Sequence, residues 1–129
     1  MSTSRTLALV LLGGFVGGIA RALLVAAEGP GAPWITWLVN VVGAFALGVL
    51  LGAWVRPGLA PGWARPLLGT GLLGGFTTFS AVAHSLDRLA AGGTPAVAAG
   101  YLAATVVLGV AAAATGLGVG DRVARQGEA

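Results

Sequence analysis

Four long apolar stretches fill most of this chain and constrain its fold more than any other feature. A helix that crosses the hydrocarbon core of a bilayer needs about 20 apolar residues. Such stretches run over about residues 7–27, 34–55, 67–89 and 96–120, and charged residues, glycines or prolines separate them. The sequence therefore predicts an all-α membrane protein, with residues 1–129 forming a single domain of four transmembrane helices.

The composition excludes most soluble functions. Hydrophobic residues make up 57% of the 129 residues and charged residues only 9%, far from the averages of a soluble domain. The seven arginines are scattered without interleaved aromatic residues, which favours positions flanking a membrane over nucleic-acid binding. Because cysteine is absent, the chain has no disulfide and no thiolate metal site.

The first stretch has one alternative interpretation. Arg5 precedes the apolar run, and the small residues at 25–27 resemble the cleavage site of a secretory signal peptide. Arg21 would interrupt the core of such a signal, so we favour a transmembrane helix. Tryptophans near the predicted span ends support the boundaries, because indole rings prefer the membrane interface; they are Trp34, Trp37, Trp54 and Trp63.

Glycines spaced four residues apart occur in every stretch. In a membrane, such small residues let helix backbones approach closely. A thin, glycine-rich bundle has little interior of its own, which favours self-association or pairing with a related subunit. The pairs are Gly14 with Gly18, Gly48 with Gly52, Gly71 with Gly75, and Gly116 with Gly120.

Few polar residues lie inside the predicted spans, where a polar group is costly unless it is paired or functional. Arg21 can either snorkel to the interface or face a wet cavity. Asn40 can donate two hydrogen bonds from its amide, either to a ligand or between helices. Tyr101 and Thr105 are one turn apart, so they form a short polar track unless the threonine bonds to its own helix.

The densest polar cluster is Gly74-Gly75-Phe76-Thr77-Thr78-Phe79-Ser80, in the third stretch. Glycine and β-branched threonine both disfavour a regular helix. The sequence therefore predicts that the third helix is broken at mid-membrane. Backbone carbonyls freed by such a break can hold a hard cation.

The residues offer little for catalysis, so we do not expect an enzyme. The spans lack a nucleophile with a matching base. His84 and Asp87 are three residues apart, but without a second histidine they favour an interfacial pair over a metal site or proton relay. The G-x-G-x-x-G match at residues 69–74 follows no strand and is not a dinucleotide site.

Three motifs stand out in the first three stretches. They are Gly13-Gly14-Phe-Val-Gly17-Gly18-Ile-Ala-Arg21, Trp37-Leu-Val-Asn40-Val-Val-Gly43-Ala-Phe45 and the run at residues 74–80. In order, spacing and chain length they resemble one family, the small dual-topology fluoride channels called CrcB or Fluc proteins. The resemblance implies a fluoride-specific channel that conducts cytoplasmic fluoride passively out across the inner (plasma) membrane, reducing fluoride toxicity.

The resemblance also implies an antiparallel dimer with narrow pores at the subunit interface. The backbone carbonyls of Gly74 and Thr77 would hold a structural sodium ion at the dimer centre, a role suited to oxygen ligands. Phe79 would present the positive edge of its ring to fluoride, and Asn40 would donate from its amide. By resemblance, Ser80, Tyr101 and Thr105 would continue the polar track, and Arg21 would attract the anion or hold the packing.

The chain departs from the family pattern after Ser80. The family often has threonine, phenylalanine and, three residues further on, glutamate where this chain has Ala81, Val82 and Ser85. A symmetric homodimer would therefore lack side chains that usually line at least one pore.

The arginines predict the orientation of the chain. Positive residues concentrate on the cytoplasmic side of membrane proteins, so both termini are expected there. Copies that all insert one way cannot form an antiparallel dimer, and we expect a heterodimer with a paralogous subunit of opposite orientation. If the arginine bias sets the orientation only statistically, some copies would insert inverted and permit a homodimer. The terminal side carries Arg5, Arg56, Arg65, Arg122 and Arg125, whereas only Arg88 clearly lies on the other.

Two other functions remain open. Glycine-rich helices could form a structural packing subunit of a membrane complex. A small multidrug-type transporter would need a carboxylate inside the membrane, and the first, second and fourth spans have none.

Overall fold

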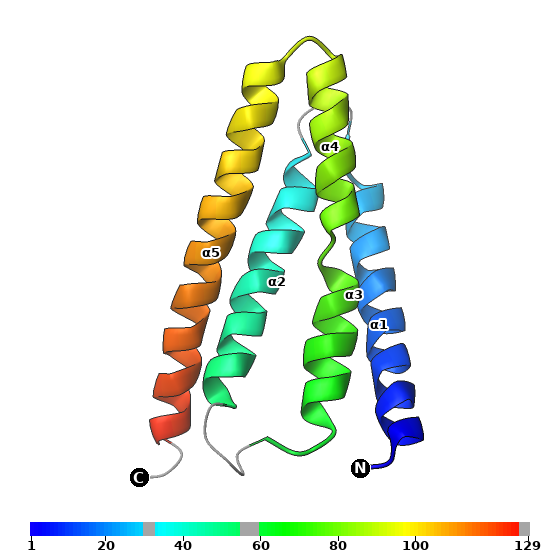
Figure 1. Cartoon of the computed structure of the whole chain (residues 1–129), viewed down its shortest axis with the longest axis vertical. Coiled ribbons are helices and arrows are strands. Elements are labelled where there is room, and N and C mark those ends of the chain that lie inside the picture. The colour runs from blue at the N-terminus through cyan, green and yellow to red at the C-terminus, as the bar shows by residue number, and fades with distance from the viewer. Residues whose placement is uncertain (30–32, 55–59, 127–129) are drawn as a thin grey trace.

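The computed structural model describes residues 1–29, 33–54 and 60–126, and within these it is helical without strands. The third helix, Arg65–Ala91, consists of three consecutive segments, η1, α3 and α4, so the described residues form four long helices (Figure 1). All four are long and apolar enough to cross a membrane, which confirms the predicted all-α membrane fold. The segments are α1 (Thr3–Ala26), α2 (Trp34–Ala53), η1 (Arg65–Leu73), α3 (Gly74–Phe76), α4 (Phe79–Ala91) and α5 (Pro95–Gln126).

The outer helices continue past the apolar stretches that predicted them. α1 begins at Thr3, and α5 runs on through a polar final turn to Gln126. There Arg125 Nη2 lies 2.7 Å from a carboxylate oxygen of Asp121, one turn earlier, and such a pair supports helical structure without apolar contacts. Residue 55, the predicted end of the second span, and Arg56 lie outside the described residues.

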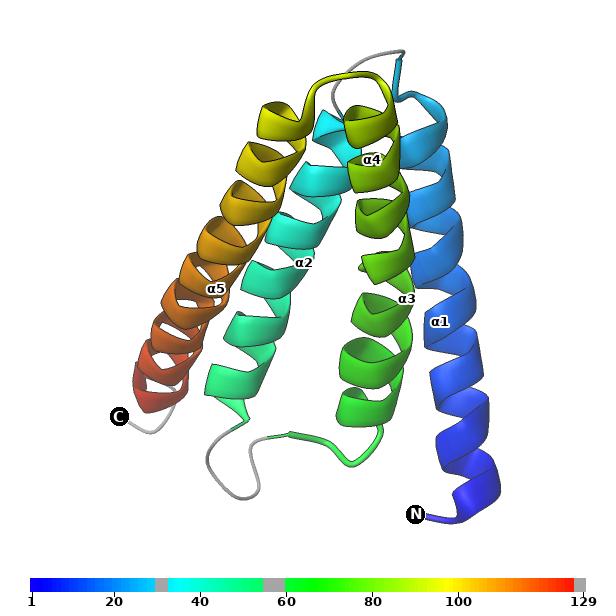
Figure 2. The same cartoon turned by 45° about the horizontal axis from the view of Figure 1, so that its top comes forward.

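The helices pack as two pairs. α2 lies along α5, and α1 lies along η1 and α3, while α4 crosses to contact α5. Figures 1 and 2 show the two pairs diverging toward the end where α1 begins and α5 ends. A cavity of about 680 Å³ lies at that end between α2, η1 and α5.

Glycines bring the helices of each pair into backbone contact. A Cβ atom added at any of three predicted glycine pairs would come within 2.8 Å of a carbonyl oxygen on the facing helix. Only glycine permits so close an approach. The confirmed pairs are Gly48 with Gly52 in α2, Gly71 with Gly75 in the third helix, and Gly116 with Gly120 in α5.

α1 departs from the predicted glycine pairing. Its contact pair is Gly13 with Gly17, each of which would overlap a carbonyl oxygen of η1 if it carried a Cβ atom. Of the predicted pair, Gly14 does touch the third helix, because its carbonyl oxygen would lie 2.5 Å from a Cβ atom at Gly75, whereas nothing lies within 4 Å of a Cβ atom at Gly18. The spacing was right, but the face of α1 that meets η1 passes one residue earlier.

Large apolar side chains mostly point outward from these pairs. Leu11, Phe15 and Leu23 in α1 and Val107 and Val110 in α5 are exposed, as side chains that face lipid should be. The core of the described residues combines glycines and alanines with a few larger side chains such as Trp54, Leu73 and Tyr101, and its buried polar residues are Thr36 and Ser85.

Candidate functional site

The third helix is interrupted at Thr77 and Thr78. α3 ends at Phe76, both threonines have extended backbone (φ −81°, ψ 152° and φ −149°, ψ 122°), and α4 begins at Phe79. Thr78 then caps α4, because its hydroxyl oxygen accepts a hydrogen bond from the Ala81 N–H at 3.2 Å. A helix therefore ends and a new one starts within two residues.

Asn40 of α2 pairs with the backbone of Thr78 at this interruption. The Thr78 N–H donates to Asn40 Oδ1 at 2.8 Å, and Asn40 Nδ2 donates to the Thr78 carbonyl at 3.0 Å. Asn40 thus joins two helices, one of the two roles that the sequence left open. Its amide carries two hydrogens and Thr78 takes one, so the second remains available to a ligand.

The interruption redirects two N–H groups from the carbonyls they would meet in a continuous helix. Helical geometry would direct the Thr78 N–H to the Gly74 carbonyl and the Ala81 N–H to the Thr77 carbonyl. Asn40 and the Thr78 hydroxyl accept these hydrogen bonds instead. The affected carbonyls, on Gly74 and Thr77, are the pair expected to bind sodium.

Arg21 and Gly43 secure the neighbouring helices at the interruption. Arg21 Nε of α1 donates to the Gly75 carbonyl at 3.1 Å, so its side chain reaches the third helix. A Cβ atom at Gly43 of α2 would overlap Cγ2 of Thr77. Sequence reasoning gave Gly43 no role of its own, and only its place three residues after Asn40 hinted at one.

A cavity of about 300 Å³ lies beside the interruption and brings together several predicted site residues. Phe79 is 84% exposed and presents its ring there. The Thr105 hydroxyl donates its only hydrogen to the Tyr101 carbonyl of its own helix at 2.7 Å. Its oxygen can therefore only accept a hydrogen bond from a group in the cavity. The lining residues are Asn40, Thr77, Thr78, Phe79, Val82, Leu102, Thr105 and Val106.

Ser80 and Tyr101 lie apart from that cavity lining. The Ser80 hydroxyl pairs with the Thr78 hydroxyl at 3.1 Å. Tyr101 is 7% exposed, and its hydroxyl has no hydrogen-bond partner among the described residues. Its ring lines a separate, apolar cavity of about 420 Å³ with Trp34 and Trp37.

Two residues that depart from the family pattern are buried on α4. Val82 lines the cavity beside Phe79. The Ser85 hydroxyl donates to the Ala81 carbonyl of its own helix at 2.8 Å. Neither residue offers a hydrogen-bond donor to that cavity.

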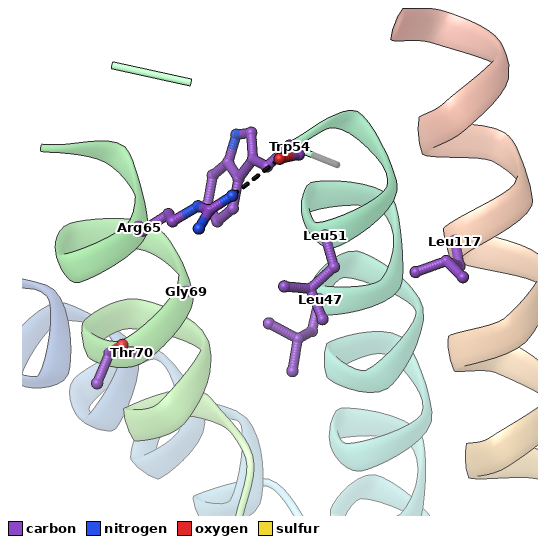
Figure 3. A pocket seen from close by; sticks show the side chains of 7 residues that line it. All are labelled: Leu47, Leu51, Trp54, Arg65, Gly69, Thr70 and Leu117. Atoms are coloured by element: carbon purple, nitrogen blue, oxygen red, sulfur yellow. Dashed lines mark hydrogen bonds between the residues drawn. The ribbon is translucent and has the colours of Figure 1, made fainter. Parts of the chain in front are cut away.

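The larger cavity between the helix pairs is lined by one exposed arginine, Arg65. Arg65 Nη2 donates to the Trp54 carbonyl at 2.8 Å, and the guanidinium lies 6.0 Å from the Trp54 ring (Figure 3). The other lining residues include Leu47, Leu51 and Thr70. Sequence reasoning treated Arg65 only as a flanking charge, and nothing in its spacing from Trp54 predicted this contact.

No group of three or more histidine, aspartate or glutamate side chains gathers within the described ranges. A metal there would have to rely on other oxygen atoms, such as backbone carbonyls.

Comparison with known proteins identifies relatives across most of the chain. The family described as "CrcB-like protein, Camphor Resistance (CrcB)" matches residues 8–117. "Fluoride-specific ion channel FluC 2" of Streptomyces avermitilis is 46% identical over 77% of this chain, and the match spans 65% of that protein, just under two thirds. "Fluoride-specific ion channel FluC" of Novosphingobium aromaticivorans is 42% identical over 87% of this chain and 93% of its own length.

A third relative, "Fluoride-specific ion channel FluC 2" of Leifsonia xyli, is 42% identical over 92% of this chain and 86% of its own length. These relatives are named as ion channels and not as enzymes, in agreement with the expectation from the sequence. Four apolar helices, motifs in the expected order and a match over residues 8–117 agree, and the chain therefore belongs to the CrcB-like family of multi-pass membrane proteins.

Proposed function

We propose that this chain is a subunit of a fluoride-specific channel that lets cytoplasmic fluoride leave the cell passively. The cavity at the helix interruption carries the proposal. It combines the ring of Phe79 with an amide hydrogen of Asn40 that the protein does not use. Relatives named as fluoride-specific channels support the same function.

The cavity suits a small anion that must bind and then leave. The edge of the Phe79 ring is weakly positive, and the Asn40 amide donates without carrying a charge. Conduction requires binding that is favourable enough for entry and weak enough for exit. No charged side chain is among the residues that line this cavity, which favours weak binding.

Arg21 contributes to this pathway by holding the packing. Its Nε hydrogen bond to Gly75 ties α1 to the third helix next to the interruption. The guanidinium keeps further N–H groups and a positive charge, which lower the cost of bringing an anion close. Ser80, Thr105 and Tyr101 would extend the polar track by donating from their hydroxyls, for which Thr105 must release the Tyr101 carbonyl and the Tyr101 hydroxyl must turn toward the anion.

A structural sodium ion fits the backbone beside this cavity. The carbonyls of Gly74 and Thr77 have lost their helical donors, and carbonyl oxygens are ligands that hard cations prefer. Thr77 lies against Gly43, where a larger residue would displace it. A bound sodium ion would supply positive charge at the centre of an antiparallel dimer.

The partner in this dimer is a paralogous subunit of opposite orientation. Arg5, Arg65 and Arg125 lie at the end of the bundle where α1 begins and α5 ends. The positive-inside rule would place that end, with both termini, in the cytoplasm of a cell whose plasma membrane the chain spans. The buried Val82 and Ser85 support a subunit that contributes unequally to the two pores.

A fluoride efflux assay tests the channel function. Proteoliposomes loaded with fluoride or with chloride would be prepared with this chain alone and with its paralogue. We expect the mixed liposomes to release fluoride much faster than chloride, as measured with ion-selective electrodes. Equal efflux of the two halides would overturn a fluoride-specific channel, and an absence of efflux would favour a structural packing subunit.

The same liposomes test the partner requirement. If this chain must pair with a paralogue, liposomes that contain it alone should release fluoride no faster than protein-free liposomes. Rapid, fluoride-selective efflux from the chain expressed and purified alone would refute the heterodimer while supporting the channel.

A further inference from the structure

Glu28 lies just beyond α1, yet its side chain contacts α2. One carboxylate oxygen accepts a hydrogen bond from the Thr36 N–H at 2.9 Å, and the other accepts one from the Thr36 hydroxyl at 2.9 Å. Thr36 is only 1% exposed. The carboxylate therefore has both oxygens engaged by a buried residue on a different helix.

This contact caps the start of α2. The first N–H groups of a helix have no partner within the helix, and their end of the helix carries partial positive charge. Pro33, which precedes α2, makes no side-chain capping bond. Glu28 therefore takes the place of a local cap, and its charge makes the hydrogen bonds stronger than those of a neutral side chain.

Thr36 and Asn40 link this cap to the interruption in the third helix. They are four residues apart on α2, so they share one face at a separation of about 6 Å along the axis. α2 is thus held at Thr36 by Glu28 and at Asn40 by Thr78. Hydrogen bonds of 2.8–3.0 Å tolerate little displacement, so a rotation of α2 would disturb the pairing of Asn40 with Thr78.

We propose that Glu28 is a positioning residue for the anion pathway. Its carboxylate fixes the rotation and register of α2, so that the Asn40 amide meets Thr78 and keeps its second hydrogen for the anion. This inference rests on the proposed channel function, because it assigns Glu28 a role in the same pathway. Both oxygens already accept hydrogen bonds at the positive end of α2, which offsets the repulsion that a free carboxylate would exert on fluoride.

Amide hydrogen exchange tests the positioning without relying on transport. Glu28→Ala should accelerate exchange of the Thr78 N–H, as Asn40→Ala should by removing its acceptor. Glu28→Gln should have a smaller effect, because its amide oxygen can still accept from the Thr36 N–H. Asp87→Asn is the matched control, because it removes an exposed carboxylate on α4 and should leave Thr78 unchanged.

The exchange pattern also separates positioning from simple capping. If Glu28→Ala accelerates exchange only in the first turn of α2 while Thr78 keeps its protection, Glu28 is a local cap and the proposal is wrong. Residue-level fragmentation mass spectrometry of the full chain with its paralogue resolves these two patterns.

Fluoride efflux provides the second test. Glu28→Ala should slow efflux about tenfold, the change expected when one charge-assisted hydrogen bond is lost. In an Asn40→Ala background the same substitution should have no further effect. Equal slowing in both backgrounds would overturn the positioning role. If the unmodified protein passes no fluoride, the channel proposal fails, and the exchange of Thr78 still decides whether Glu28 positions Asn40.

Discussion

Replacing Gly116 by alanine tests whether backbone contact sets the spacing of α2 and α5. A Cβ atom there would overlap the Phe45 carbonyl oxygen and lie 3.0 Å from the Val49 nitrogen. Helix backbone atoms cannot rotate away as a side chain can, so α5 must move off α2. Overpacking of this kind costs about 1–3 kcal/mol, and the higher helix propensity of alanine returns up to about 1 kcal/mol. Because the overlap is with backbone atoms, the cost should lie in the upper part of that range, about 2–3 kcal/mol, and we expect a net loss of about 1–2 kcal/mol in unfolding free energy.

Gly118 provides the matched control on the same helix. Nothing lies within 4 Å of a Cβ atom there, so Gly118→Ala should be neutral or gain up to about 1 kcal/mol. Unfolding by sodium dodecyl sulfate in mixed micelles, followed by circular dichroism, gives both free energies. A Gly116→Ala variant as stable as the unmodified protein, or a Gly118→Ala variant equally destabilised, would refute the reasoning.

Three further predictions concern the interruption. Asn40→Ala should lower the unfolding free energy by about 1–3 kcal/mol, since two hydrogen bonds to Thr78 are lost within the membrane. The same unfolding assay measures this loss, and a variant with slower efflux but unchanged unfolding free energy would contradict the prediction. Gly43→Ala should displace Thr77 and raise the sodium concentration needed for efflux, measured by replacing sodium stepwise with a bulky organic cation; an unchanged sodium dependence would argue against the carbonyl site. Thr105→Val should slow fluoride efflux less than Asn40→Ala, because the threonine hydroxyl already donates to its own helix; equal slowing would show that this hydroxyl switches partners.

The helices and their contact faces were predictable because they depend on local composition. Runs of about 20 apolar residues are themselves the physical requirement for crossing a bilayer. Glycines four apart also predicted three of the four contact pairs, since that spacing places both on one helix face. The exception is α1, where a Cβ atom would overlap η1 at Gly13 and Gly17 and not at Gly14 and Gly18. The run GGFVGG at residues 13–18 offers two pairs with the same spacing, and only the position of the facing helix decides between them.

The site depended on contacts between distant parts of the sequence, which spacing alone does not encode. Asn40 was recognisable as an unusual polar residue, but its pairing with Thr78 joins residues 38 positions apart. Glu28 is one of the charged residues that separate the apolar stretches, and its bond to Thr36 depends on how the end of α1 lies against α2. The Arg65 contact with Trp54 likewise depends on how η1 packs beside the end of α2.

The glycine contacts between helices also bear on how such a protein can evolve. Where two helices touch through main-chain atoms, their separation does not depend on the side chains that face lipid. After gene duplication, one copy can therefore exchange lipid-facing residues and its flanking arginines while the helix pairs stay assembled. Orientation in the membrane can then diverge between the two copies before their architecture does.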